Sequence, residues 1–445
     1  MREFTFDSVI EFFRKTLQDL PDLRTGKNTI YTIADAALAA FSVFFTQNPS
    51  FLAFQKSMQQ NKGKNNAQSL FRVQAIPSDN QIRNLLDPVP PTHLFPIFSY
   101  IFYGLNDMGH LGSYRSYNGN LLLALDGVQY FSSTSIHCEN CNKKEPRNGT
   151  TTYSHSVITP VIVAPGNNNV IPLQPEFITP QDGHKKQDCE NAAAKRWIRL
   201  YSQGYSQFGF TILGDDLYCK QPLCELMLDQ NFDFILVCKP DSHKTLYQWI
   251  EGLDSNDLNT HIVKRWTGKR QEIDTYRFVN NVPLKDGADA LHVNWCELTT
   301  TLATDQIIYK NAFATNFEIH KENVEQLVIN GRARWKVENE NNNVLKNRGY
   351  HLEHNFGHGK KHLSSILATF NLLAFLFHTL LAFLFHTLLD NVDKKYKLVR
   401  DNLPARKTFF DDIRALTRYL YFDNWEALLD FMIRGLELEA RPDTS

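Results

Sequence analysis

Two apolar segments of this sequence run directly into acidic residues. In "LLLALDGV" five apolar residues precede Asp126, and in "FTILGDDLY" a second apolar run ends at Asp215 and Asp216. Short apolar runs of this kind are typical of strands buried in a helix-covered sheet. Because open α/β sheets place their ligand sites at the carboxyl ends of strands, we interpret these acids as candidate site residues. For either acid alone, a turn residue or a helix N-cap is the simpler interpretation.

The segments around these acids predict an α/β fold with a mixed sheet. "YSHSVITPVIVAP" and "FDFILVCKP" have the composition of further strands, whereas "ENAAAKRWIRLYSQ" has that of a helix. Strands and helices that alternate in this way build mixed sheets. We assign the chain to five parts: a helical N-terminal domain at 1–95, the α/β unit at 96–245, a mainly β insertion at 246–310, the rest of the α/β unit at 311–390, and a helical region at 391–445.

The charge and cysteine content limit the environment and partners of the chain. Its 47 Lys and Arg residues nearly balance 48 Asp and Glu residues, so any surface that binds DNA must be local. A short helix capped by Ser78 presents Gln81, Arg83 and Asn84, which are groove-reading residue types, although a solvated helix face explains them more simply. Seven cysteines and the lack of a signal-peptide pattern predict a reducing, cytoplasmic location.

An apolar eight-residue sequence, "LAFLFHTL", occurs twice in tandem at 373–380 and 381–388. The two copies make an apolar stretch long enough to cross a bilayer, whereas one copy would leave an ordinary buried helix. Two histidines within the stretch argue against a membrane span, so we expect no membrane partner. Eight added residues rotate a helix by about 80° beyond two full turns. We therefore expect altered packing register after the repeat.

A third acid lies on a segment with helical composition, "ARWKVENENNNVLK". Glu338 follows Arg334 by four residues and shares its helical face, and Glu340 is the alternative third acid. Three carboxylates can hold a pair of Mg²⁺ or Mn²⁺ ions, which catalyse phosphodiester chemistry without a side-chain nucleophile.

These acids lie in segments that resemble a known family. "LALDGVQYFSS", "ILGDDLY" and "RARWKVENENNNVLKNRGYHLEHNFGHG" follow one another with a β insertion before the last, and this combination resembles the DDE-type transposases of bacterial insertion sequences over about residues 75 to 370. The resemblance implies a ribonuclease-H-like catalytic core with Asp126, Asp215 and Glu338 as its triad. Asp215 matches better than Asp216 because the family pattern places an apolar residue and a Tyr after the Asp and one variable residue. Double-stranded DNA as partner, a homodimer or larger assembly on DNA, and a location at a prokaryotic nucleoid are also implied.

The third motif departs from the family pattern, which is a Tyr, an Arg, the Glu and a Lys on one helix. Arg334 and Glu338 keep the expected spacing, but Gly331 stands where the Tyr would be and Lys346 comes one residue late. A long, flexible lysine side chain can compensate for a small offset. We therefore predict that Arg334 and Lys346 contact DNA phosphates.

Two further patterns suggest metal or DNA binding. "HCENC" places Cys138 and Cys141 at a zinc-knuckle spacing, with two ordinary reduced thiols as the alternative. A structural zinc site needs four ligands, and the candidates to complete this one are His137, His155, His184 and Cys189. In "GYHLEHNFGHGKKH" the helix-like spacing of His351, His354, His358 and His362 allows a metal site as the alternative, but glycines argue against one continuous helix. We predict a turn that brings the following side chains to DNA phosphates: His354, His358, Lys360 and Lys361.

The family resemblance implies a transposase that cuts the ends of its own insertion sequence and joins them to target DNA, and the three acids are consistent with that chemistry. Three acids would hold two Mg²⁺ or Mn²⁺ ions for this reaction. Two alternatives stay open. One is a ribonuclease-H-like nuclease that cleaves without joining, and the other is a DNA-binding remnant inactivated by the "LAFLFHTL" duplication.

Overall fold

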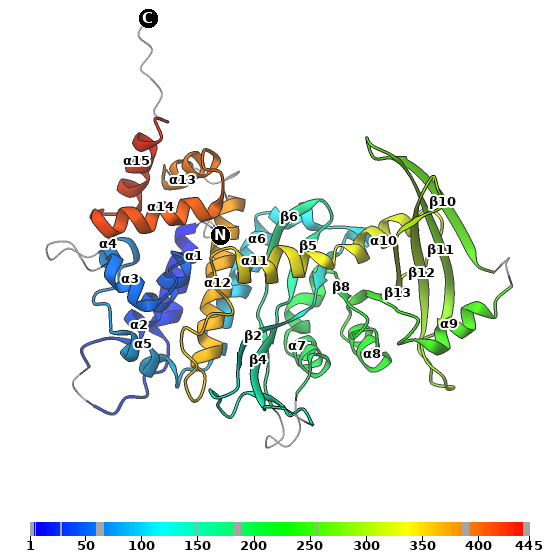
Figure 1. Cartoon of the computed structure of the whole chain (residues 1–445), viewed down its shortest axis with the longest axis horizontal. Helices are drawn as coiled ribbons and strands as arrows, with labels where there is room; N and C mark the ends of the chain where they lie inside the picture. Colours follow the sequence, from blue (N-terminus) through cyan, green and yellow to red (C-terminus); the bar gives the residue numbers. More distant parts are fainter. Residues whose placement is uncertain are drawn as a thin grey trace, which may run out of the picture.

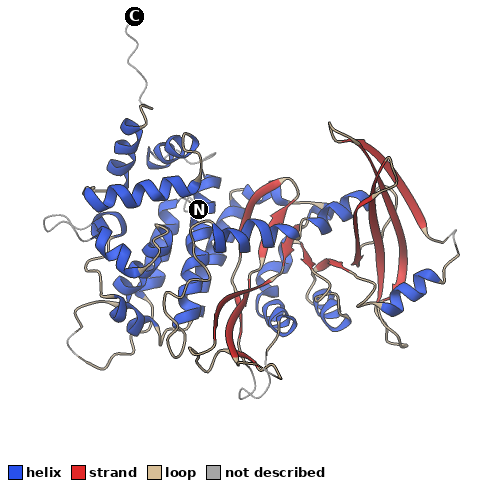
Figure 2. Ribbon diagram, viewed as in Figure 1, coloured by secondary structure: helices blue, strands red, loops and turns tan. Residues whose placement is uncertain are grey.

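The computed structural model of the 445-residue chain describes residues 4, 6–26, 29–58, 66–147, 149–180, 188–254, 257–384 and 391–438. Three parts follow one another along the longest axis of the molecule: a helical part, a central sheet with helices, and a long antiparallel sheet (Figure 1). Figure 2 shows that the strands are confined to the second and third parts. The predicted α/β class with a mixed sheet is confirmed.

The central part of the sheet is built from short, largely buried strands. β1 pairs in parallel with β8, which pairs in parallel with β9, while β5 and β6 add antiparallel strands on the other side of β1. The bounds are β1 (Leu121–Ala124), β5 (Val161–Ala164), β6 (Asn167–Pro172), β8 (Phe210–Gly214) and β9 (Asp233–Val237). All residues of β1, β5 and β8 are buried, which explains why their sequences are apolar runs without alternation.

The predicted β insertion extends the same sheet. Its four strands are antiparallel, and the last one pairs with β9, so that nine strands follow the order β10-β11-β12-β13-β9-β8-β1-β5-β6. The bounds are β10 (Asn259–Trp266), β11 (Gln271–Pro283), β12 (His292–Leu302) and β13 (Ile307–Thr315). The insertion thus runs to residue 315 and begins with helix α9 (Lys244–Glu251), slightly different from the 246–310 expected from composition. Because the end of β13 pairs with β9 inside the sheet, its last four residues are buried.

A second, smaller sheet begins where β1 ends. The chain leaves β1, passes Asp126 and enters β2, which pairs antiparallel with β4; β3 and β7 complete this sheet. The bounds are β2 (Gly127–Ser133), β3 (Asn142–Lys144), β4 (Thr152–Ile158) and β7 (Glu176–Ile178). Asp126 therefore lies at the switch between the two sheets.

Helices from both ends of the chain pack together in the first part of the molecule (Figure 1). α2 contacts α12, and α3 contacts α14, so the N-terminal helices and the C-terminal region share one core. The bounds are α1 (Phe6–Gln18), α2 (Ile33–Phe45), α3 (Phe51–Met58), α4 (Asn66–Phe71), α5 (Asp79–Leu86), α12 (Leu363–Leu384), α13 (Asn391–Asp401), α14 (Arg406–Tyr419) and α15 (Trp425–Gly435). Ser78 caps α5, as its sequence predicts, because its hydroxyl accepts from the Gln81 N–H.

The remaining helices surround the central sheet. α7 and α8 contact each other, and α10 packs against β9, β11 and β12. The bounds are α6 (Phe95–Asp107), α7 (Glu190–Tyr205), α8 (Gln221–Asp229), α10 (Val324–Arg332) and α11 (Asn343–Asn347), with a π-helical segment η5 (Val337–Asn342) between the last two. Short 3-10 turns occur at η1 (Pro91–Leu94), η2 (His110–Tyr114), η3 (Tyr117–Gly119) and η4 (Ser206–Phe208).

The duplicated apolar segment begins inside a buried helix. Leu363–Leu380 is long and apolar enough to cross a membrane, but 89% of it is buried within the protein. His378 of the first repeat copy is buried, and its Nδ1 atom lies 2.6 Å from the Tyr350 hydroxyl. This contact gives the polar ring a partner inside the core. The second copy starts in the last turn of α12 and continues outside the described residues, as does the expected change of register.

Candidate active site

Asp126 and Asp215 lie at the same edge of the central sheet. β1 and β8 are parallel, with Ala124 opposite Leu213. Asp126 lies two residues after Ala124, and Asp215 lies two residues after Leu213. The pairing continues one step further, because the Leu125 N–H donates to the Leu213 carbonyl at 2.9 Å. Two rigid strands therefore bring two acids that are far apart in sequence to equivalent positions.

The predicted third acid lies on η5, a π-helical segment that contacts β5 and β6. π-Helical turns are rare in proteins, and those that do occur are often found at functional sites. Glu338 is exposed near the start of η5, whereas Asn342 at its end is buried and donates its amide Nδ2–H to Asp126 Oδ2 at 3.0 Å. Asn342 also accepts from the Thr159 hydroxyl at 3.0 Å. The segment thereby fixes the orientation of the Asp126 carboxylate.

The electrostatics of Asp126 show which groups surround it. Burial raises the pKa of Asp126 to about 6; Arg334 acts in the opposite direction, and Glu190, Asp215 and Glu338 raise it further. The structure thus brings together all three acids of the expected triad and the expected Arg334. Glu338 is among the acids that raise the pKa of Asp126.

The two neighbouring aspartates after β8 have different surroundings. The Asp215 carboxylate accepts from the Leu217 N–H at 2.9 Å and contributes to the raised pKa of Asp126. Asp216 instead accepts from the Lys239 N–H at 2.6 Å and lies 3.3 Å from the His243 Nε2 atom. Asp216 therefore supports the turn after β9, whereas Asp215 is the one of the two that acts on the pKa of Asp126.

Glu190 is a fourth acid that sequence reasoning missed. Glu190 is the first residue of α7, and its carboxyl group occupies the space that a Cβ on Gly127 would need, so the glycine next to Asp126 makes room for it. The Tyr218 hydroxyl donates to Glu190 Oε2 at 3.3 Å. Burial raises the pKa of Glu190, and the charge on Asp215 raises it further. In the sequence Glu190 looked like an ordinary acid in the first turn of a helix.

Gly331, which replaces the Tyr of the family pattern, is enclosed by the sheet. A Cβ at this position would lie 2.7 Å from Phe313 Cδ1 and 2.9 Å from Ile235 Cγ2. α10 therefore packs directly on β9 and β13 at this glycine. A tyrosine does not fit there, which accounts for the departure without affecting the acids.

The residues expected to contact DNA lie in two different settings. Lys346 forms an ion pair with Glu353 at 2.8 Å. The side chains of His354, Lys360 and Lys361 are exposed, as a DNA-contacting role requires. His358 is different: it is 7% exposed and lies against Cys141, so its imidazole does not face solvent.

The loop that carries these residues is held by the N-terminal helices. Backbone N–H groups of Lys360 and Lys361 donate to the Asp87 carboxylate at 3.0 to 3.1 Å. Arg83 donates its Nε–H to the Phe356 carbonyl at 3.1 Å. Of the candidate groove readers on α5, Arg83 is thus engaged within the protein, whereas Asn84 is exposed.

The zinc-knuckle cysteines have histidine neighbours. Cys138 and Cys141 lie together with His155 and His358, and the ligand atoms of all four are within 4.8 Å of one another. His155 was among the expected partners and His358 was not. Of the other expected partners, His137 and Cys189 are exposed, and His184 lies outside the described residues.

The acids at the strand ends have the chemistry of a site for a hard divalent cation. Mg²⁺ and Mn²⁺ prefer carboxylate oxygens. Three acids and one arginine act on Asp126, and burial is the largest cause of its raised pKa. Asp126, Asp215 and Glu338 supply oxygen ligands of the kind that such an ion prefers, so they are candidate ligands.

No protein-family model matches the chain, and no curated protein matches it. Among solved structures, the chain is similar to a piggyBac transposase in a synaptic complex with hairpin DNA, determined by cryo-electron microscopy. The similarity covers 100% of this chain and 84% of that chain, with 9% sequence identity and a TM-score of 0.41. Because both values are low, we base the functional proposal on the residues of this chain.

Proposed function

We propose that this protein is a DDE-type transposase that performs metal-dependent phosphoryl transfer on DNA. The observation that carries the proposal is the convergence of Asp215, Glu338 and Arg334 on Asp126, from strands and a helix that are far apart in sequence. Each acid alone has a structural explanation, but a half-buried turn residue has no need of the acids Glu190, Asp215 and Glu338 around it. The central mixed sheet with its helices supports the proposed ribonuclease-H-like core.

The residues of the site have distinct roles in this reaction. Asp126, Asp215 and Glu338 would hold the metal ions, which would supply activation of the attacking oxygen and charge stabilisation for the leaving oxygen. Asn342 fixes the Asp126 carboxylate, so that little reorganisation is needed when DNA binds. Arg334 is positively charged and close to Asp126, where it can neutralise a DNA phosphate.

DNA is the proposed partner, bound at the ends of the mobile element and at its target. The exposed side chains of His354, Lys360 and Lys361 and the partly exposed Lys346 supply contacts to phosphates. The helical N-terminal domain is the proposed end-binding domain. Two ends must be brought together for joining, so we propose a homodimer or larger assembly on DNA in the prokaryotic cytoplasm.

The test compares two glutamates that lie two residues apart. Purified full-length protein is incubated with Mg²⁺ and the DNA that borders its gene, and both cut and joined products are measured. We expect Glu338→Gln to abolish cleavage, because a neutral amide is a poor metal ligand, while Glu340→Gln keeps it. Equal activity of both variants would remove Glu338 from the site.

The same assay separates the two rival functions. Cut DNA without joined product would indicate a nuclease that does not perform strand transfer. A version that lacks residues 381–388 tests the effect of the duplication. If only this shortened chain cuts DNA, the natural chain is an inactive copy of a transposase.

A further inference from the structure

Four metal-ligating side chains meet away from the acids, at the junction of the small sheet and the loop before α12. Cys138 and Cys141 follow β2, His155 lies in β4, and His358 lies between α11 and α12. Cys141 and His358 are 217 residues apart in sequence. From this cluster we infer a structural zinc site with two cysteine and two histidine ligands.

The separations between the four ligand atoms are those of a tetrahedral zinc site. With Zn–S of about 2.3 Å and Zn–N of about 2.0 to 2.1 Å, tetrahedral geometry places two sulfurs about 3.8 Å apart, sulfur and nitrogen about 3.5 Å apart, and two nitrogens about 3.3 Å apart. The two Sγ atoms lie 3.9 Å apart, and the two Nε2 atoms 3.1 Å. The sulfur–nitrogen distances between Cys138 and His155, Cys141 and His155, and Cys141 and His358 are 3.6, 3.4 and 3.4 Å.

The orientation of His358 is the one that a metal ligand requires. Its Nδ1 atom lies 2.9 Å from the Gly359 carbonyl, to which it can donate a hydrogen bond. This bond selects the tautomer in which Nε2 carries a lone pair, and Nε2 is the atom that faces the other three ligands. Metal-ligating histidines typically donate their second ring N–H in this way.

The surroundings of the cluster fit a structural site closed to solvent. Cys141, His155 and His358 are 5%, 4% and 7% exposed. The ring of Phe131 packs on His358 with centroids 4.5 Å apart, and Tyr130 stacks on His155. The two imidazole Nε2 atoms lie 3.1 Å apart, close enough for one metal ion to bind both of them. Four protein ligands fill a tetrahedral zinc completely, as in structural rather than catalytic sites.

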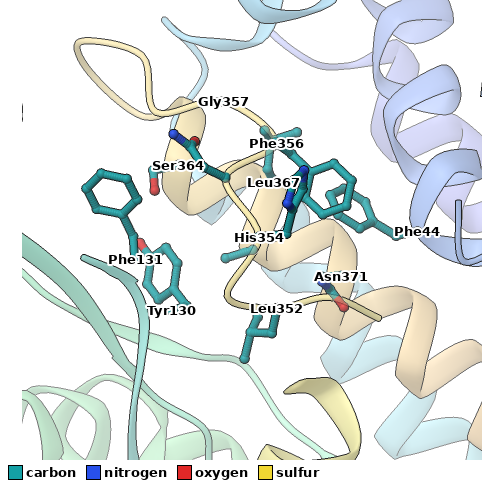
Figure 3. Close-up of a pocket in the computed structure, with 12 residues that line it drawn as sticks. Phe44, Tyr130, Phe131, Leu352, His354, Phe356, Gly357, Ser364, Leu367 and Asn371 are labelled. Atoms are coloured by element: carbon teal, nitrogen blue, oxygen red, sulfur yellow. The ribbon is translucent and has the colours of Figure 1, made fainter. Parts of the chain in front are cut away.

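A zinc ion here joins two segments that flank the acid site. β2 begins directly after Asp126, and the His358 loop follows the η5 and α11 segment that carries Glu338. Figure 3 shows this loop between strand β2, with Tyr130 and Phe131, and helix α12. One hydrogen bond crosses the same junction, from Asn140 Nδ2–H to the Lys361 carbonyl at 2.7 Å. The inference rests on the four side chains alone and is independent of the proposed function.

The first experiment measures the metal content of the purified full-length chain by elemental analysis. We expect about one zinc ion per chain, and about a tenfold or greater loss in His358→Asn. His354→Asn is the matched control, because it changes an exposed histidine of the same loop and keeps the zinc. A folded chain without zinc, or full zinc content in His358→Asn, would overturn the inference. Loss of zinc only on substitution of Cys238, which lies in a second group with Cys219 and His243, would place the metal elsewhere and also overturn it.

A ligand exchange keeps the inference testable if His358→Asn does not fold. Full-length protein reconstituted with Co²⁺ should show the visible absorption of tetrahedral cobalt with thiolate charge transfer. His358→Cys should still bind the metal, with stronger charge transfer because a third sulfur replaces a nitrogen. A cobalt spectrum that does not change in His358→Cys would exclude this histidine as a ligand.

Discussion

Removing the charge of Asp126 should stabilise the metal-free protein while it destroys the site. Burial and three neighbouring acids raise the pKa of Asp126 from 3.8 to about 6. This difference in pKa corresponds to about 3 kcal/mol of unfavourable free energy for the charged carboxylate at pH 7.5. Asp126→Asn removes this charge and can still accept the hydrogen bond from Asn342.

The sign of the effect depends on pH in a defined way. The folded pKa lies above the unfolded value, so between about pH 4 and 6 the folded state holds a proton that the unfolded state has lost. The stability contributed by this proton is present at pH 4 and is lost as the pH rises through about 6. The difference in unfolding free energy between Asp126→Asn and the natural protein should therefore grow from near zero at pH 4 to about 3 kcal/mol at pH 7.5.

The assay is thermal unfolding at both pH values, with a chelator and with Mg²⁺. For a chain of this length 3 kcal/mol corresponds to about 3 °C in Tm, with the variant higher in chelator at pH 7.5. Mg²⁺ at ten times its Kd should stabilise the natural protein by about 1.4 kcal/mol and should have little effect on the variant.

Asp216→Asn is the matched control for this experiment. Its carboxylate lies next to the site in sequence but accepts from Lys239, so this variant should keep the response to Mg²⁺. An Asp126→Asn variant that melts below the natural protein in chelator at pH 7.5, or that gains as much from Mg²⁺, would refute the reasoning.

Three further predictions follow from the geometry of the site and its support. Asn342→Ala leaves buried partners of this amide unsatisfied, and we expect a loss of about 1 to 3 kcal/mol in unfolding free energy together with slower DNA cleavage. Gly331→Ala places a Cβ 2.7 Å from a ring atom of Phe313 and should destabilise the protein by about 1 to 3 kcal/mol in urea unfolding, whereas Gly112→Ala, which meets nothing within 4 Å, should have little effect. Cleavage at low Mg²⁺ should fall as the pH drops below about 6, because a protonated Asp126 cannot bind the ion, and a rate independent of pH from 5 to 8 would contradict this role.

Several features of the fold could be predicted from local sequence. β1 and β8 are recognisable because strands buried on both faces must be apolar throughout, and a single acid at the end of such a run stands out. The parallel pairing of these strands then places Asp126 and Asp215 at one edge, as the sequence indicates. Ser78 was also identifiable as a helix cap, because capping depends only on a residue three positions away.

Other features depend on contacts between distant segments, which local sequence does not encode. The continuation of the β insertion into the main sheet is decided by the pairing of β13 with β9. Glu190 joins the acids because Gly127 leaves space for it, and neither residue indicates this by itself. His358 seemed to be one basic residue of an exposed turn, but the packing of its loop on β2 buries it beside Cys141. The amino-acid sequence thus determined which strands form and which acids end them, whereas tertiary packing decided which further side chains reach those positions, because burial and proximity are properties of the whole fold.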